Sequence, residues 1–300
     1  SYILGGGVLI QGIQAIKNAF SDLTQIDKDL IDISRVASES LDLGQYTTHA
    51  NELGMTLNQT TSDILQTAYS VQKLGYDLEG SGDELVRWSS IFSNVADISV
   101  DEAMGELVTV MKGFNLQASE SERVINAFNE VSNRMSVNAS DIGEGFKSSA
   151  ASLHLANTSL EQGIALITGA TEVLRDAGRA GNGLKTVSLR VQSYSEKLKK
   201  MGVEAYDAQG NLRSLYDIMI QASDVYNSMS SDKDKYNLLE TLGGRQQASV
   251  IASLISNIEG VKKAYDIAMN SMGSATTEQE RLMNSIDAKM NALKENLLGM

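Results

Sequence analysis

The sequence predicts a mainly α-helical protein of repeated helical hairpins, with one small β-hairpin and with long amphipathic helices on either side. Three observations support this prediction. Proline is absent from the 300 residues, so no residue obligatorily breaks a helix. Apolar residues recur at helical spacing through long stretches of the chain. A turn followed by a helix-start pattern also returns three times at a nearly constant interval.

The first predicted element is a long amphipathic helix over about residues 8–40. The apolar residues that define its buried face are Ile13, Ile16, Phe20, Leu23, Leu30 and Ile33. We therefore expect three segments along the chain. They are an N-terminal amphipathic helix (1–40), a helical core (41–270) and the start of a coiled-coil-like helix (271–300).

The three copies of the repeat lie in the core. They read Gly-Tyr-Asp-Leu at 75–78, Gly-Phe-Asn-Leu at 113–116 and Ser-Leu-His-Leu at 152–155, in steps of 38 and 39 residues. Each is followed by a Ser or Thr with Glu three residues later, the spacing of a helix-capping box: Ser81/Glu84, Ser119/Glu122 and Thr158/Glu161. A repeat of this length is typical of helix–turn–helix units that pack on their neighbours. We expect six apolar side chains to point inward at equivalent places: Tyr76, Leu78, Phe114, Leu116, Leu153 and Leu155.

A small β-hairpin is predicted at residues 203–214. Residues 203–207 alternate in polarity, Gln-Gly-Asn at 209–211 is a turn signal, and residues 212–214 can return. Helices are expected from Ser214 onward, with breaks near residues 230–231 and 243–244.

A glycine-rich stretch at residues 178–186 is the nearest approach to a phosphate-binding loop. Such a loop needs Gly-Lys-Ser/Thr in sequence, but Leu184 separates Gly183 from Lys185. We therefore expect a turn in which at least one glycine has positive φ and ends the preceding helix, without nucleotide binding. The glycines assigned to structural turns in this way are Gly75, Gly113, Gly178, Gly181, Gly183, Gly243 and Gly244.

The charge of the chain argues against nucleic-acid binding. Its 38 acidic and 25 basic residues give a net charge of −13, and no basic patch alternates with aromatic residues. No apolar run is long enough to predict a membrane span. The chain begins and stops inside helical patterns, so we expect it to be an excerpt of a longer protein.

No catalytic, cofactor-binding or metal-binding residue is expected. Cysteine is absent, and neither of the two histidines, His49 and His154, lies in a metal-binding pattern. The paired carboxylates lie at predicted helix starts, where negative charge favours the helix dipole. These features favour a structural role over an enzymatic one.

A heptad pattern runs to the C-terminal end of the sequence. Its apolar positions, called the seam here, are spaced 3, 4, 3, 4 and 3 residues apart and are Met283, Ile286, Met290, Leu293, Leu297 and Met300. This spacing predicts either an oligomeric coiled coil or a helix that packs its apolar stripe on its own domain.

Several motifs together resemble the conserved core of phage tail tape measure proteins. The first is the helix and glycine-rich turn at residues 163–167 and 176–185, in which Ala180-Gly181 matches the family and Asn182-Gly183 replaces its usual Thr-Ala. Residues 136–146, 207–212 and 242–248 resemble, in order, a segment leading into the repeat helices, a short hairpin and a Gly-Arg-x-x-Ala step. The resemblance covers residues from about 35 to 300.

This resemblance implies a virion protein in the lumen of a phage tail tube, or of a prophage or tail-like particle. It would set tail length during assembly in the host cytoplasm and take part in genome ejection. The implied partners are further copies of itself, with a trimer or hexamer favoured, the tail tube protein, tail assembly chaperones, distal tail or baseplate proteins, and the host membrane at ejection. No cofactor and no specific nucleic-acid partner is implied.

Two other readings of the sequence are a helical secreted toxin or effector that interacts with membranes, and an enzyme. A toxin should carry a signal segment or a long apolar hairpin, and an enzyme should have polar groups converging in a cleft. The full-length reading frame would separate these classes, because a tape measure protein should continue for hundreds of helical residues.

Overall fold

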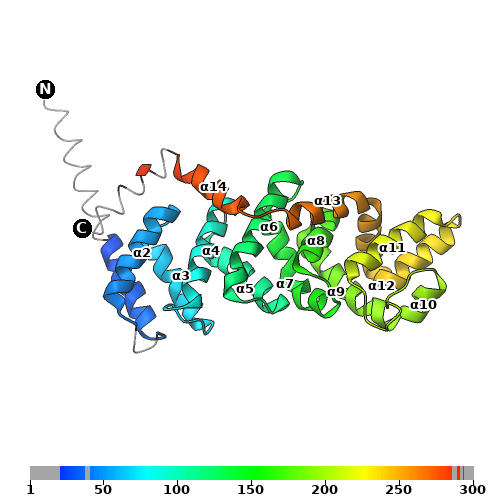
Figure 1. Cartoon of the computed structure of the whole chain (residues 1–300), viewed down its shortest axis with the longest axis horizontal. Coiled ribbons are helices and arrows are strands. Elements are labelled where there is room, and N and C mark those ends of the chain that lie inside the picture. The colour runs from blue at the N-terminus through cyan, green and yellow to red at the C-terminus, as the bar shows by residue number, and fades with distance from the viewer. Residues whose placement is uncertain (1–20, 38–40, 286–288, 291–292, 294–300) are drawn as a thin grey trace, which may run out of the picture. The chain divides into compact units, whose positions relative to one another are not determined.

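The computed structural model describes residues 21–37, 41–285, 289–290 and 293, and it is almost entirely helical (Figure 1). Contacts divide the chain into two compact units. We call the residues up to Met104, with those from Thr277 onward, the N-terminal unit, and Gly105–Thr276 the central unit. The mainly α-helical fold class is confirmed. The three-segment division expected from the sequence stays a prediction.

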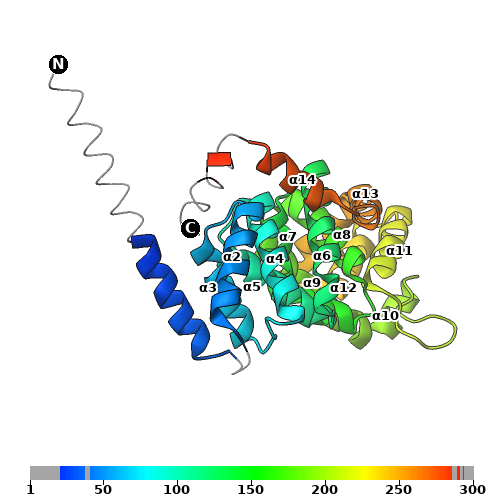
Figure 2. The same cartoon turned by 60° about the vertical axis from the view of Figure 1, so that its left-hand side comes forward.

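The N-terminal unit is built on three successive helices that pack side by side (Figure 2). They are α2 (Leu43–Leu57), α3 (Thr61–Lys73) and α4 (Ser81–Ala96). Their facing apolar residues form the core, in which Ile64, Leu85 and Phe92 are fully buried. The unit also holds the first residues of α5 (Val100–Phe114) and most of α14 (Ser274–Met283).

The expected N-terminal helix is described over residues 21–34, and the earlier part of that prediction lies outside the described residues. Ile33 on this helix is buried. The carboxylate of Asp29 is also buried and accepts hydrogen bonds from the side chains of Gln25, Ser62 and Gln66, two of them on α3. These bonds satisfy a buried charge that would otherwise be costly.

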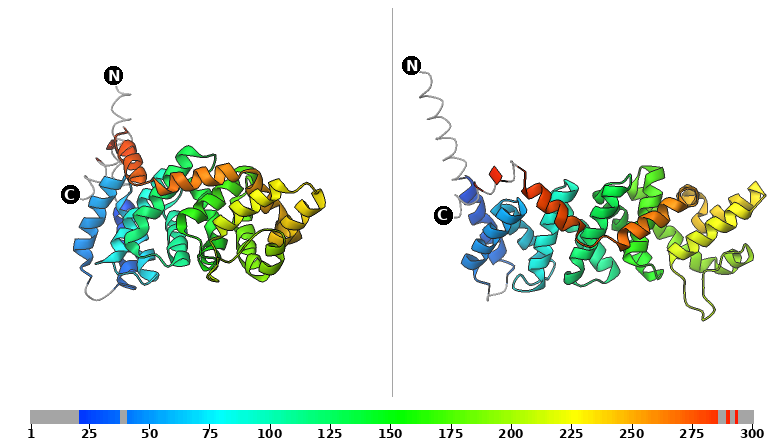
Figure 3. Two further views of the ribbon diagram at one scale, coloured as in Figure 1. Left: turned by 45° about the vertical axis from the view of Figure 1, so that its right-hand side comes forward. Right: turned by 45° about the horizontal axis from the view of Figure 1, so that its top comes forward.

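The central unit contains the helices from α5 to α13. They are η1 (Ala118–Glu120), α6 (Ser121–Arg134), α7 (Ala139–Leu155), α8 (Leu160–Leu174), α9 (Ala177–Ser193), α10 (Ser195–Lys200), α11 (Leu215–Ser228), α12 (Asp232–Ser256) and α13 (Ile258–Met269). Helices α7 and α9 pack most extensively. The chain then returns, and α13 lies across α8 and α6, far back in the sequence (Figure 3).

The glycines at 178, 181 and 183 do not form a turn, and this prediction was wrong. All three lie inside α9, and the residue with positive φ that ends α8 is Arg175. Gly181 instead permits close helix packing, because a Cβ atom there would lie 2.0 Å from the carbonyl oxygen of Gly145 on α7. A Cβ atom on Gly183 would likewise lie 2.6 Å from Val250 on α12.

Gly113 also lies in a helix, α5, and not in a turn as expected. A Cβ atom there would lie 2.4 Å from the Cβ of Ala150 on α7, so this glycine too is needed for close approach. Gly75 differs, since its φ of +86° ends α3 in the left-handed conformation.

The expected break at Gly243-Gly244 is a kink inside α12, where Gly244 has φ +66° and ψ 175° while Gly243 remains helical. The kink frees backbone carbonyls of the preceding turn. Arg190 on α9 satisfies two of them, donating to the carbonyl oxygens of Glu240 (3.0 Å) and Thr241 (3.2 Å).

The repeat is present as a shared helix ending, but its register differs from the sequence pattern. The residues in the left-handed conformation are Gly75, Asn115 and Asn157. After each one, the next backbone N–H donates to the carbonyl oxygen five residues earlier, as in a Schellman motif: Tyr76 to Val71, Leu116 to Met111 and Thr158 to Leu153. The structural spacing is therefore 40 and 42 residues.

This shift in register explains which of the six side chains predicted to point inward are buried and which are not. Leu78, Phe114 and Leu153 are buried as predicted, and Tyr76 and Leu116 are half-buried. The prediction for Leu155 is wrong, because α7 continues beyond the expected turn and leaves this side chain 75% exposed.

The helix starts are capped at positions other than those predicted. The boxes that form include Gln117 with Glu120 and Ser159 with Gln162, whereas α4 begins at Gly80 without a side-chain cap.

The β-hairpin is absent from the described residues, where only an isolated antiparallel bridge joins Tyr206 and Leu212. The turn itself exists: the Asp207 carboxylate accepts from the backbone N–H groups of Gln209 and Asn211, and the φ of Gly210 is +85°. Ser214 caps α11 immediately afterwards, so the returning arm is too short for a strand.

Candidate functional site

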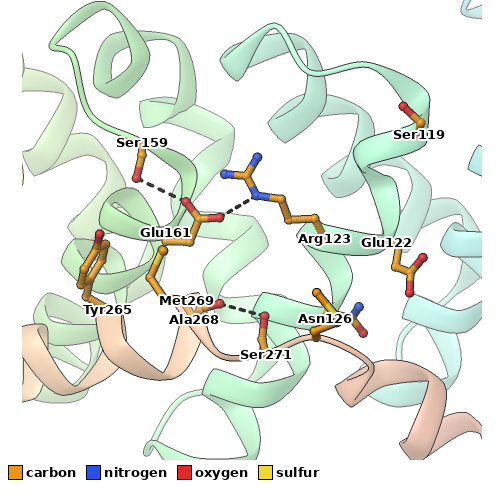
Figure 4. A pocket seen from close by; sticks show the side chains of 11 residues that line it. Ser119, Glu122, Arg123, Asn126, Ser159, Glu161, Tyr265, Ala268, Met269 and Ser271 are labelled. Atoms are coloured by element: carbon orange, nitrogen blue, oxygen red, sulfur yellow. Dashed lines mark hydrogen bonds and ion pairs between the residues drawn. The ribbon is translucent and has the colours of Figure 1, made fainter.

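A pocket of the central unit lies between α6, α8 and α13 and has a volume of about 730 Å³ (Figure 4). Its walls are placed by ordinary helix packing. The apolar face of α6 is buried, α8 starts at the capping residue Ser159, and α13 closes over both helices.

An ion pair crosses the pocket wall. Nε of Arg123 on α6 lies 2.7 Å from Oε1 of Glu161 on α8, and the two side chains point toward each other in Figure 4. The Glu161 side chain is only 7% exposed, whereas that of Arg123 is 48% exposed. Arg123 also pairs with Glu120 at 3.0 Å, and the hydroxyl of Ser159 donates to Glu161.

These contacts determine the electrostatics of the pocket. The hydrogen bond from Arg123 to Glu161 is the main cause that raises the pKa of Arg123, while burial acts in the opposite direction. The cation therefore stays charged and is balanced by two carboxylates. Because Arg123 lies on α6 and Glu161 on α8, this ion pair links the two helices.

Buried amides of α6 hold the segment after α13 in place. The side-chain oxygen of Asn126 accepts from the backbone N–H of Ala275 (2.9 Å), and the amide of Asn129 donates to Ser274 (2.9 Å). The hydroxyl of Ser274 in turn donates to Glu130 (2.6 Å). The polar residues on the buried face of α6 are thus satisfied by a segment almost 150 residues away in the sequence.

Apolar side chains form the outer rim of the pocket. Tyr265 and Met269 of α13 line it, and Met272 is 96% exposed. Methionine side chains adapt to irregular surfaces. With its charges balanced inside and methionines at its rim, the pocket suits packing against another polypeptide.

The sequence did not single out this pocket. Glu161 was assigned to helix capping, and Arg123, 38 residues earlier, was not singled out. No local signal pointed to α13, because its contacts depend on the return of the chain.

The seam residues are only partly described. Met283 ends α14, and Met290 and Leu293 are exposed. Ile286, Leu297 and Met300 lie outside the described residues. The seam therefore stays a prediction. None of the described helices is both long and apolar enough to cross a bilayer.

Comparison with protein families supplies the decisive observation. The model of the phage-related minor tail protein family matches residues 47–254, more than half of the chain. The chain belongs to this family. The matched residues include α6 and α8, which form two walls of the pocket, and the kink at Gly244.

The chain is also similar to an individual phage tail protein whose name states a more specific role. The chain is 22% identical over 261 residues to the tape measure protein of Pneumococcus phage Dp-1. This similarity covers 81% of the chain but 22% of the relative, so the chain spans about a fifth of that protein's length. No solved structure matches the chain.

Proposed function

We propose that this chain is the folded part of a tape measure protein. In this role it lies in the lumen of the tail tube, helps to set tail length during assembly, and takes part in genome ejection. The observation that carries the proposal is the similarity to a tape measure protein over 81% of the chain, within the minor tail family.

The fold supports a particular part of that role for these residues. A helix advances about 1.5 Å per residue, so a ruler needs long uninterrupted helices. The described helices are instead short, with the longest, α12, kinked at Gly244. We therefore propose that this segment is a compact head, and that the measuring length lies elsewhere in the full protein.

We propose a structural and non-enzymatic role for this head. Two ionisable groups of the pocket between α6, α8 and α13, Arg123 and Glu161, are committed to each other, which supports packing over proton transfer. The proposed partners are further copies in a trimer or hexamer, the tail tube protein, tail assembly chaperones, distal tail or baseplate proteins, and the host membrane at ejection. During assembly the protein is in the host cytoplasm.

An epitope tag tests the luminal location. The loop at residues 207–211 is exposed, so a tag inserted beside Gly210 in the full-length gene should leave the helices intact. We expect the tag to be protected from protease and antibody in intact virions and to become accessible after triggered ejection. A tag cleaved in intact virions with normal tails would contradict the proposal.

A further inference from the structure

The N-terminal unit has a small acidic pocket between α2 and the start of α4, with a volume of about 380 Å³. Three carboxylates line it, from Asp42, Glu79 and Asp83. The imidazole of His49 lies against one of them, with 2.8 Å between Nε2 and Oδ1 of Asp83. The ring of Tyr46 stands 5.8 Å from the imidazole ring. We call this site the Tyr46 pocket.

Tyr46 gives the pocket an unsatisfied polar atom. The residue is only 6% exposed, and its hydroxyl oxygen is buried without a hydrogen-bond partner in the described part of the chain. Burial, together with the charge of Asp83, raises the pKa of Tyr46, so the phenol stays neutral. Buried polar groups are normally paired, so this hydroxyl near the charge of Asp83 leaves one wall of the pocket incompletely satisfied.

The chemistry of the lining selects a cation with several N–H donors. A lysine ammonium has three donors and no acceptor, and it can bond to more than one of the carboxylates that line the pocket. The neighbouring aromatic ring adds attraction for a cation. The charge of the N-terminal unit strengthens this preference, because its residues 41–104 contain ten acidic and two basic residues, a net charge of −8.

The central unit presents matching cations on α10. Lys197, Lys199 and Lys200 are all exposed on this six-residue helix. No carboxylate among the described residues pairs with any of the three. Residues 175–200 contain seven basic and two acidic residues, a net charge of +5 in a chain whose total is −13. We call the three lysines the α10 lysine surface.

We propose that the α10 lysine surface of one copy docks on the Tyr46 pocket of a second copy, with a lysine ammonium entering the pocket. The contact is heterologous, since two different surfaces meet, and such contacts build rings or open filaments. It deepens the multi-copy part of the proposed function but uses no residue of the seam. A second copy is favoured over nucleic acid because both complementary surfaces lie on this chain, whose overall negative charge repels phosphates.

A charge-swap experiment on the whole 300-residue chain tests the proposal. The lysine variant carries Lys197→Glu, Lys199→Glu and Lys200→Glu, and the acid variant carries Glu79→Lys and Asp83→Lys. A control with the same charge change carries Lys112→Glu, Lys233→Glu and Lys263→Glu, all exposed elsewhere. Circular dichroism establishes that each variant folds, and sedimentation velocity measures association at low and high salt.

We expect the wild type and the control to associate at low salt, and to weaken at least about tenfold at high salt because exposed charges are screened. Each swapped variant alone should stay monomeric, and an equimolar mixture of the two should form heterodimers.

Five outcomes would overturn the inference. The first four are a monomeric wild type, a mixture of folded variants that does not associate, equal loss of association in the control, and binding of duplex DNA by the lysine surface in place of self-association. If association persists unchanged in both swapped variants, this contact is refuted while a multi-copy assembly through the seam still stands.

Discussion

Gly181 is the position where a single added methyl group should most disturb the central unit. In Gly181→Ala the new Cβ would lie 2.0 Å from the carbonyl oxygen of Gly145 and 2.8 Å from the hydroxyl of Ser148. Relaxed contacts need about 3.5 Å, so α7 and α9 must separate by roughly 1.5 Å. These two helices pack most extensively in the unit, and their backbones cannot yield as a flexible side chain can.

The expected magnitude is a difference between two effects. Alanine gains about 1 kcal/mol of helix propensity over glycine. Overpacking at a rigid contact costs about 1–3 kcal/mol or more, and a backbone clash belongs at the upper end of that range. We therefore expect Gly181→Ala to lower the free energy of unfolding by about 2 kcal/mol.

Gly105→Ala is the matched control. This glycine is exposed in the interior of α5, and a Cβ atom there would meet nothing within 4 Å. The substitution should therefore raise stability by about 0.5–1 kcal/mol. Urea unfolding followed by far-ultraviolet circular dichroism measures both variants, while fluorescence of the single tryptophan, Trp88 on α4, reports the N-terminal unit separately. If Gly181→Ala is as stable as Gly105→Ala, the close approach of α7 and α9 is refuted.

Three further predictions follow from buried contacts. Phe114→Ala should lose about 3–5 kcal/mol in urea unfolding, since Phe114 is buried edge-on against Phe146 at 5.4 Å, whereas Leu155→Ala should lose less than about 0.5 kcal/mol. Arg123→Met should cost about 2 kcal/mol by leaving the Glu161 carboxylate unpaired, and adding Glu161→Leu should recover at least half; additive losses in this double-mutant cycle would show that the pair does not couple. The pKa of Tyr46 is raised above its ordinary value of 10.0 in the folded protein. The contribution of the neutral phenol to the free energy of unfolding is therefore fully present below about pH 10 and is lost as pH rises. The stability of the wild type relative to Tyr46→Phe should therefore fall above pH 10, and parallel unfolding curves for the two proteins would contradict this.

Helical periodicity identified most of the fold because it is a local property of the chain. Glycine was harder to interpret, since the same residue serves both tight turns and close helix packing. Gly75 adopts positive φ, but Gly181 and Gly183 are explained only by Gly145 and Val250, which lie on other helices. Nothing in residues 178–186 distinguishes the two uses.

The predicted hairpin and the third repeat failed because neighbouring signals competed. Ser214 starts α11 and leaves too few residues for a returning strand. In the third repeat Asn157, and not Ser152, takes the left-handed conformation, which shifts the helix end and exposes Leu155.

The pocket could not be predicted because its parts are distant in the sequence. Arg123 and Glu161 are 38 residues apart, and the residues of α13 that form the third wall lie more than 100 residues beyond Glu161. Asn126 and Asn129 lie on the buried face of α6, and their partners at residues 274–275 are identified only in the folded chain.

The return of α13 over α8 and α6 determines the order in which contacts of the central unit break under tension. Tension applied to the chain beyond Thr276 first reaches the bonds that Asn126 and Asn129 make to residues 274–275, and then the contact of α13 with α8. That contact is close, because a Cβ on Gly169 of α8 would lie 2.2 Å from Val261 of α13. Peeling of residues 258–276 would release roughly 65 Å of extended chain while the α7–α9 pair stays intact. We therefore expect the central unit, pulled from this side, to lengthen in a discrete step before it unfolds.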